Sequence, residues 1–516
     1  MSYLSTINRV AGLASGIDTE QMVQDLMKVA RIPLDRMLQK RQILQWQQSD
    51  YRTINQSLID FRANQALKMK LQGTFSAKKA TSSDATVVTA TPGSNASAGT
   101  YNIEVTQLAR VASDISSAAL SASSADKIDP TATLESQKSK FASQWGATTT
   151  LQFSITTHPN GGAAVTKTFN VDTTVDSLNA VLARINAETS LGVTAFYEES
   201  TDKVVLSTTK TGDYATNEIE VADTTDTFAL GTLHLSATAQ GQNAVVSING
   251  LTGITKYENS FTFNNITFNL LKQTSGTPVT VTVANDTDAV VDTIKSFVED
   301  FNSLLKTLND KLNEKRYLDY PPLTDAQKEQ MTDKQIEQWE EKAKSGLLSN
   351  DTILQSAASE VRRALTTPVT GLTTYDSVFD IGVTTGFYFE GGTLYLDETK
   401  LREAISTNPD AVMQLFTTDG TSYTYEQQGL GVRLYNTVND MVDRLTDKAG
   451  FPSEFALYDN SFIATDIRDL EERISDTEDR LSAMEDRYWR QFTAMEQAIA
   501  QFNTQSAWLS RQSQGG

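Results

Sequence analysis

The sequence of 516 residues contains no cysteine and only two histidines, His158 and His234. Without cysteine, the chain can form neither a disulfide nor a cysteine-ligated zinc site, and it has no thiolate nucleophile. Neither histidine belongs to a recognisable catalytic or metal-binding motif, and the patterns H-E-x-x-H, G-x-S-x-G and G-x-x-x-x-G-K-[ST] are missing from the sequence. We therefore expect no enzymatic activity, no metal site and no cofactor.

Basic residues and long apolar runs are also scarce. The chain has 44 Lys and Arg against 64 Asp and Glu, which gives a formal net charge of −20. A chain this acidic repels nucleic acid and anionic membrane surfaces, so we expect neither as a partner. No stretch approaches the roughly 18 consecutive apolar residues that a membrane-spanning helix needs. Residues 1–9 lack a basic segment followed by an apolar core, so we expect no cleaved signal peptide.

What the chain does have is a seven-residue apolar repeat near its C-terminus. The residues between the repeating positions are mostly Glu, Asp, Arg, Ser and Gln. This pattern predicts a long helix with a single apolar seam, which needs a partner helix along its length. The repeat consists of Ile467, Ile474, Leu481, Tyr488, Met495, Phe502 and Leu509.

A weaker row with the same spacing lies near the N-terminus, at Met37, Leu44, Tyr51 and Leu58. Upstream of it, the spacing predicts a helix over residues 15–31 that is capped by Asp18. We expect Pro33 to interrupt this helix and to start a second one over 33–70. The two termini are thus predicted to pair as a coiled-coil-like leg.

Between these ends the apolar period changes from about 3.5 to about two, which is typical of strands. Four short strands are expected in 244–284, a helix over 175–188, and loops or partial order over 111–148. Helical spacing returns at about Asp288, where a broad apolar face begins. We therefore predict an α+β multidomain fold with terminal helices and two inserted β-rich head domains. The expected domains are 1–36 with 463–516, 37–73 with 286–462, 74–110 with 239–285, and 111–238.

Several short segments resemble one bacterial family. Gly12-Leu13-Ala14-Ser15-Gly16-Ile17-Asp18-Thr19 begins the likeness, and Gly99-Thr100-Tyr101-Asn102-Ile103-Glu104-Val105 and Gln240-Gly241-Gln242-Asn243 continue it. Leu394-Tyr395-Leu396-Asp397 and Gln505-Ser506-Ala507-Trp508-Leu509 follow in the same order. Together these segments resemble the flagellar filament cap proteins, the flagellar hook-associated protein 2 family. Residues 111–238 carry little of the likeness.

The resemblance implies an extracellular cap at the distal tip of the bacterial flagellum that promotes folding and insertion of exported flagellin. It implies a homo-oligomer of about four to six copies, export by the flagellar type III pathway, and flagellin and an export chaperone as partners. Some members also bind host mucin. Another axial flagellar junction protein and a surface adhesin with a glycan-binding β head are the alternatives. The β domains could equally be spacers or self-association surfaces.

The C-terminal seam leaves two possibilities open. Its proximal half is expected to pack within the chain, on residues 37–61 and on the helix after Asp288. Its distal half, 484–509, lacks enough N-terminal partner, so it is a candidate for contacts with other subunits or with the filament. Aromatic residues such as Trp508 could dominate such a contact, and core packing is the alternative. We also expect roughly the first thirty and the last fifty residues to be mobile in a free subunit and to become ordered on assembly.

Overall fold

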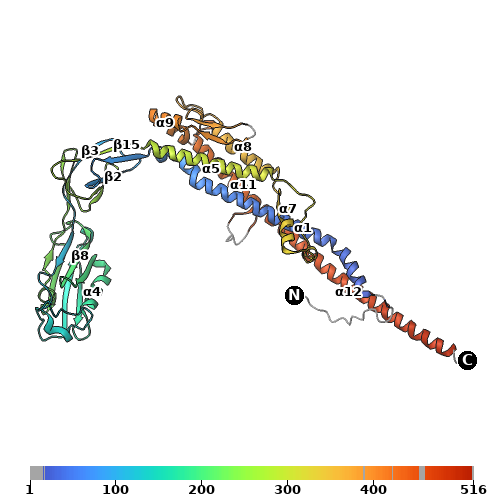
Figure 1. Cartoon of the computed structure of the whole chain (residues 1–516), viewed down its shortest axis with the longest axis horizontal. Helices are drawn as coiled ribbons and strands as arrows, with labels where there is room; N and C mark the ends of the chain where they lie inside the picture. The colour runs from blue at the N-terminus through green and yellow to red at the C-terminus, as the bar shows by residue number, and fades with distance from the viewer. Residues whose placement is uncertain (1–15, 17, 388–389, 421, 453–458, 514–516) are drawn as a thin grey trace. The chain divides into compact units, whose positions relative to one another are not determined.

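The computed structural model describes residues 16, 18–387, 390–420, 422–452 and 459–513, and these residues form two compact units. The first unit takes its described residues from Met1–Phe75 and Thr287–Gly516, and the second is Ser76–Asp286. We call them the helical unit and the β unit. Figure 1 shows the first as helices drawn from both ends of the chain and the second as strands from its middle. The predicted fold class, terminal helices around β-rich inserted domains, is confirmed.

The helical unit is built mainly from five long helices and several short elements. The elements before the β unit are α1 (Thr19–Phe61), the π-helical turn η1 (Arg62–Ala66), α2 (Leu67–Lys70) and α3 (Gln72–Phe75). Those after it are α5 (Thr287–Asn313), α6 (Asp325–Lys328), α7 (Asp333–Lys344), α8 (Thr352–Thr366), β16 (Val383–Thr385), β17 (Leu394–Leu396), α9 (Glu398–Thr407), α10 (Pro409–Thr417), η7 (Tyr425–Gln427), α11 (Leu430–Ala449) and α12 (Phe462–Ser513).

Helix α1 differs from the prediction, because it runs through Pro33 without a break. Its N-terminus is as expected: the Asp18 carboxylate accepts a hydrogen bond from the Gln21 backbone N–H at 2.9 Å. Pro33 has no N–H to donate, which costs an interior helix about 3 kcal/mol. Met27 and Leu34, on either side of it, are buried against α12. Burial of two such side chains contributes about 1.5–3 kcal/mol each, which offsets the missing hydrogen bond.

The core of the helical unit lies where the second half of α1 meets α5, α8 and α11. The broad apolar face predicted after Asp288 is buried, and Phe61 of α1 packs its ring against Phe297 and Phe301 of α5 at 6.1 and 6.4 Å. Arg433 of α11 is fully buried there and donates hydrogen bonds to four backbone carbonyls, those of Thr367, Pro368, Tyr425 and Glu426. This guanidinium therefore fastens two loops to the start of α11.

The β unit contains four antiparallel sheets. Its strands are β1 (Lys78–Ser82), β2 (Val88–Pro92), β3 (Gly99–Gln107), β4 (Val111–Ile115), β5 (Thr150–Thr157), β6 (Val165–Asp172), β7 (Val193–Glu198), β8 (Lys203–Thr211), β9 (Ile219–Thr225), β10 (Thr238–Ala239), β11 (Ala244–Ile248), β12 (Leu251–Lys256), β13 (Ser260–Phe263), β14 (Ile266–Leu270) and β15 (Val279–Asn285). Its helical elements are η2 (Glu135–Lys140), η3 (Pro159–Gly161), α4 (Leu178–Ala187), η4 (Thr189–Leu191) and η5 (Phe228–Thr232).

These sheets enclose two separate apolar cores. The first lies between the sheet of order β1-β15-β3-β11-β12 and the sheet of order β13-β14-β2. The second lies among the sheets β10-β9-β5-β6 and β4-β8-β7 and helix α4, which forms where a helix was predicted over 175–188. Each core draws on one face of its strands, as the period of two requires.

Two predictions for the β unit need correction. The segment 111–148, expected as loops or partial order, contains β4 and η2 and places Leu120, Phe141 and Trp145 in the second core. Its large apolar residues after Ile115 are too widely spaced to show a period, yet they are buried. The sequence also missed β12, the edge strand beside β11. Its residues alternate poorly because the strand is largely exposed and contains a glycine at positive φ, Gly253.

Candidate assembly surface

The N-terminal half of α1 and the helix α12 lie side by side and run in opposite directions (Figure 1). Their contact is a cluster of buried apolar side chains. From α1 it takes Val23, Met27 and Leu34, and α12 contributes Leu470, Ile474, Leu481 and Trp489. With the half-buried Ala30, which packs against this cluster, the spacing on α1 alternates between four and three residues. On α12, Ile474 and Leu481 belong to the predicted heptad row, and Leu470 and Trp489 lie beside it. This is how two helices pack with a single shared seam.

A set of polar contacts holds the other end of this helix pair. The Arg52 guanidinium of α1 donates to the Asp459 carboxylate at 2.6 Å and to the carbonyl of Ala449, the last residue of α11, at 2.8 Å. The same carboxylate accepts from the Gln48 side-chain amide at 3.0 Å and from the Ser461 backbone N–H at 2.9 Å. Asp459 therefore fixes the point at which the chain enters α12.

The predicted residues of α1 divide between two environments. Met37 and Leu44 lie half-buried at the edge of the seam with α12. Tyr51 and Leu58 lie in the helical-unit core, and the Tyr51 hydroxyl donates to the carboxylate of Asp351, the N-cap residue of α8, at 2.6 Å. Burial and this hydrogen bond raise the pKa of Tyr51 above its ordinary value. The contact with α12 therefore starts further toward the N-terminus of α1 than the expected 37–61.

The predicted residues of α12 change from buried to exposed along the helix. Ile474 and Leu481 are buried, and Ile467, Tyr488 and Met495 are half-buried. The last three are open to solvent: the exposed fraction is 68% for Phe502, 63% for Trp508 and 60% for Leu509. The apolar row thus continues beyond the stretch that the described part of α1 covers.

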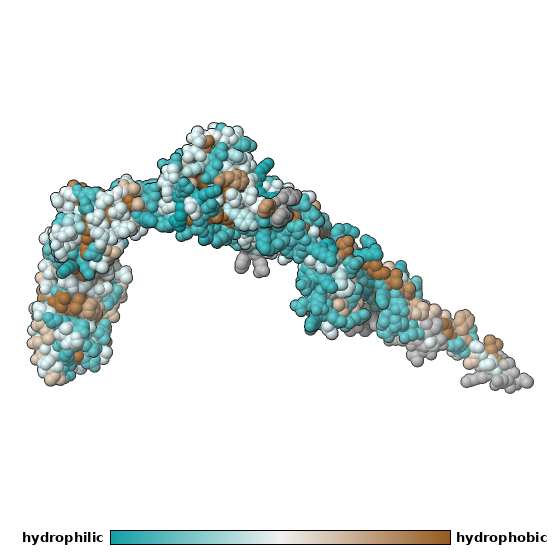
Figure 2. Space-filling view, turned by 45° about the horizontal axis from the view of Figure 1, so that its top comes forward, coloured by the Kyte–Doolittle hydropathy of each residue, from teal (hydrophilic) through white to brown (hydrophobic). Residues whose placement is uncertain are grey.

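A second apolar stripe runs along α1, and its separation from the buried seam could not be predicted from the sequence. Met22, Leu26 and Val29 each precede a seam residue by one position, so they lie about 100° around the helix from the seam, and Ile32 extends the stripe. All four are exposed, with Val29 at 67%. Hydrophobic surface along the paired helices of this unit is brown in Figure 2. The sequence indicates only that this part of α1 has apolar residues on more than one face.

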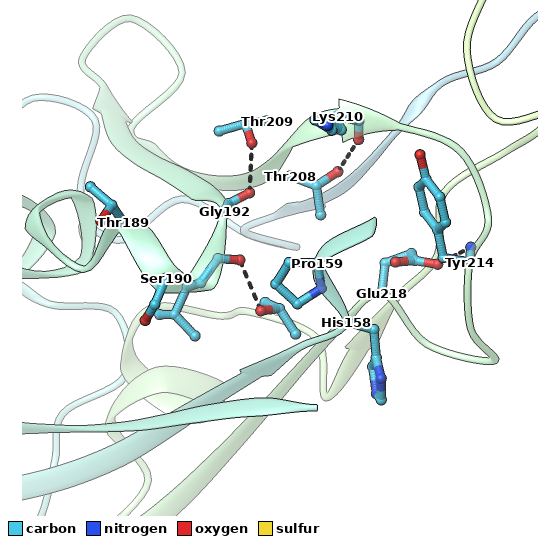
Figure 3. A pocket seen from close by; sticks show the side chains of 12 residues that line it. His158, Pro159, Thr189, Ser190, Gly192, Thr208, Thr209, Lys210, Tyr214 and Glu218 are labelled. Carbon is cyan, nitrogen blue, oxygen red and sulfur yellow. Dashed lines mark hydrogen bonds between the residues drawn. The ribbon is translucent and has the colours of Figure 1, made fainter. Parts of the chain in front are cut away.

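The β unit has a small cavity of about 170 Å³ beside β8, lined by residues that include His158, Pro159, Gly192, Tyr214 and Glu218 (Figure 3). Several of its polar groups are already engaged in hydrogen bonds. The Glu218 carboxylate accepts from the backbone N–H of Tyr214 and of Ala215, and the neighbouring threonine hydroxyls donate to backbone carbonyls. The cavity therefore presents no paired nucleophile and base.

Across the described ranges, no group of three acidic or histidine side chains has the arrangement of a metal site. Nor does any helix within those ranges have the length and apolar character needed to cross a membrane. The surface that the structure singles out is therefore the helix pair and its exposed end.

Comparison with known proteins identifies the family. The family model "Flagellar hook-associated protein 2 N-terminus" matches residues 15–112, and "Flagellar hook-associated protein 2 C-terminus" matches residues 241–504. The flagellar hook-associated protein 2 of Halalkalibacterium halodurans is 34% identical, over 98% of this chain and 99% of its own length. This chain belongs to the flagellar hook-associated protein 2 family.

More distant relatives in the family agree. The B-type flagellar hook-associated protein 2 of Pseudomonas aeruginosa is 24% identical over 86% of this chain and 84% of its own length. The crystal structure of the D1-D2-D3 domains of the flagellar cap protein FliD from Escherichia coli has a TM-score of 0.54 and 21% identity. It covers 82% of this chain and 99% of that chain, which shows a shared fold.

Proposed function

We propose that this chain forms an oligomeric cap of about four to six copies at the distal tip of the bacterial flagellum, outside the cell. In this role it promotes the folding and insertion of exported flagellin into the growing filament. It reaches the tip through the flagellar export pathway without a cleaved signal peptide, accompanied before export by a chaperone. The family membership supports this role, and the exposed end of α12 carries the argument from the structure.

That end is built for contact with other chains. Phe502 and Leu509 continue a heptad row whose members Ile474 and Leu481 are buried, and Trp508 directly precedes Leu509, yet all three remain exposed. Large aromatic side chains left uncovered on an assembly protein mark a binding surface. We propose that helices of neighbouring subunits or of the filament cover them. The exposed stripe on α1 gives the same helix pair a second apolar contact.

The experiment uses a flagellated strain that lacks its own cap protein and is complemented with this chain. The variant F502S/W508S/L509S removes the exposed row, and the matched control Q501S/Q505S/S510A changes three exposed polar positions on the same stretch. We expect the wild type and the control to support filament growth. The triple variant should release flagellin into the medium and leave short filaments.

The adhesin alternative predicts a different result. If the protein served only to attach cells to glycan, the strain complemented with F502S/W508S/L509S would have filaments of normal length. Binding of the cells to mucin-coated surfaces would then be the only property altered. Normal filaments with the triple variant would count against the assembly role of this end of α12.

A further inference from the structure

The part of α12 that packs on α1 carries two rows of charge, one on each side of the seam. Arginine directly precedes three seam residues, at Arg473, Arg480 and Arg487, and we call this row the arginine flank. Glutamate occupies Glu471, Glu478 and Glu485 on the opposite side, which we call the glutamate flank. Both rows repeat every seven residues, so each forms a line parallel to the helix axis.

Within the chain these charges are largely unused. Arg473, Arg480, Glu471 and Glu478 are exposed, and no side-chain hydrogen bond or ion pair involves them in the part of the chain that the structure describes. Helix α1 offers the arginine flank few partners, because between Val23 and Leu44 its acidic residues are Asp25 and Asp35 alone. The same stretch carries five basic residues, and within the described ranges the structure pairs none of them with the glutamate flank. No ion pair joins the described residues of α1 and α12.

The two flanks are complementary to each other. Residues that flank a helical seam choose the partner and its direction, because opposite charges attract across the contact and like charges repel. Two parallel α12 helices placed flank to flank, each with its seam on its own α1, bring the arginine row of one copy against the glutamate row of the other. In this arrangement the long side chains of Arg473 and Arg480 reach toward Glu478 and Glu485 of the neighbouring copy. Two antiparallel α12 helices would instead place arginine against arginine and glutamate against glutamate.

We infer that the arginine flank of α12 docks on the glutamate flank of α12 in a second copy of this chain, with the two helices parallel. The contact is heterologous, because one surface of each copy meets a different surface of the next. Repeated around an axis, such a contact closes a ring when the rotation between copies closes. The apolar stripe at Met22, Leu26, Val29 and Ile32 lies on the same helix pair and supplies surface to bury beside the charges.

This inference rests on the proposed function, since it assumes an oligomer, and it adds the register between subunits. The test measures self-association of the full-length chain by sedimentation equilibrium at low salt. The variants R473E and E478R each place two like charges across the contact, and R473E/E478R exchanges the two signs. The matched control D479R changes the charge by the same amount as E478R at the neighbouring exposed position, which faces away from both flanks.

We expect R473E and E478R each to weaken association about fivefold or more per interface, whereas D479R should have little effect. R473E/E478R should recover most of the wild-type affinity, and added salt should reduce all these differences. Circular dichroism of each monomer should be unchanged, because the three substituted side chains form no hydrogen bond or ion pair with the described residues of the chain.

The outcomes separate this inference from the cap proposal. If the wild type associates, three results would each refute the charge register and leave the cap proposal intact. These are an R473E variant that associates as well as the wild type, a double variant R473E/E478R that stays weak, and a D479R defect as large as that of E478R. A wild-type chain that stays monomeric at every concentration would overturn both.

Discussion

The heptad row of α12 allows one substitution to be tested in two environments. Leu481 is 7% exposed and packs on α1, whereas Leu509 is 60% exposed. Alanine at either position removes the same three carbon atoms from the same helix. The difference between the two variants therefore reports how much of the row is already covered within one chain.

The expected magnitudes follow from burial. At Leu481 the three lost carbons, at about 0.8 kcal/mol each, account for a loss of about 2–3 kcal/mol. At Leu509 less than half of the side chain is covered, so the loss stays below about 1 kcal/mol. Some amides exchange only when the helix pair unfolds. For these amides, a loss of 2–3 kcal/mol lowers the protection factor roughly 30- to 150-fold.

Hydrogen exchange on the monomeric chain at low concentration measures this. We expect L481A to accelerate exchange in α1 over 19–36 and in α12 over 467–492, and L509A to change neither segment. Wild-type amides beyond residue 499 should exchange fast in the monomer and slow down on assembly. This limit is narrower than the mobile last fifty residues expected from the sequence, because the seam at Leu470, Ile474 and Leu481 is buried.

Two results would contradict this reasoning. If L481A left the exchange of α1 unchanged, the seam would not hold the two helices together in a free subunit. If residues beyond 499 were as strongly protected in a monomer as those near Leu481, the end of α12 would already be covered and would not be available to another chain.

Three further predictions concern stability. R433M leaves four buried carbonyls without a donor, and denaturant unfolding should show a loss of about 3–5 kcal/mol in the free energy of unfolding of the helical unit. The control R444M breaks one exposed ion pair on the same helix and should cost less than about 1 kcal/mol in the same measurement. G431A should cost about 2–3 kcal/mol by the same measurement, because its β-carbon would lie 2.2 Å from a backbone oxygen of α2; an unchanged midpoint would show that α11 moves freely. Hydroxyl and N–H donors of the turn after β7 lower the pKa of Glu198 from 4.5 to about 2. The stabilising effect of the ionised Glu198 carboxylate should therefore be complete above pH 4.5 and lost as the pH falls through about 2. An NMR titration midpoint near 4.5 for Glu198 would contradict this.

Local patterns in the sequence determined the elements with strong periodicity. The seven-residue row predicted α12, the 3.6-residue spacing after Asp288 predicted α5, and Asp18 was recognised as the cap of α1. These predictions needed only neighbours within the same helix, because a helix face repeats with a fixed period. They did not require any knowledge of the partner, and the strands of the middle of the chain followed from the switch to a period of two.

Tertiary contacts decided the features that local patterns could not. Pro33 lies inside α1 because packing of Met27 and Leu34 on α12 outweighs the missing hydrogen bond, and a proline rule alone cannot include that packing. Trp145 is buried in the β unit although its segment shows no period, because its neighbours in the core come from distant strands. Which members of the α12 row are covered depends on where α1 begins, so Ile474 and Phe502 have the same position in the repeat and opposite environments. The sequence specified which residues need a partner, and the three-dimensional arrangement specified which of them have found one within the chain.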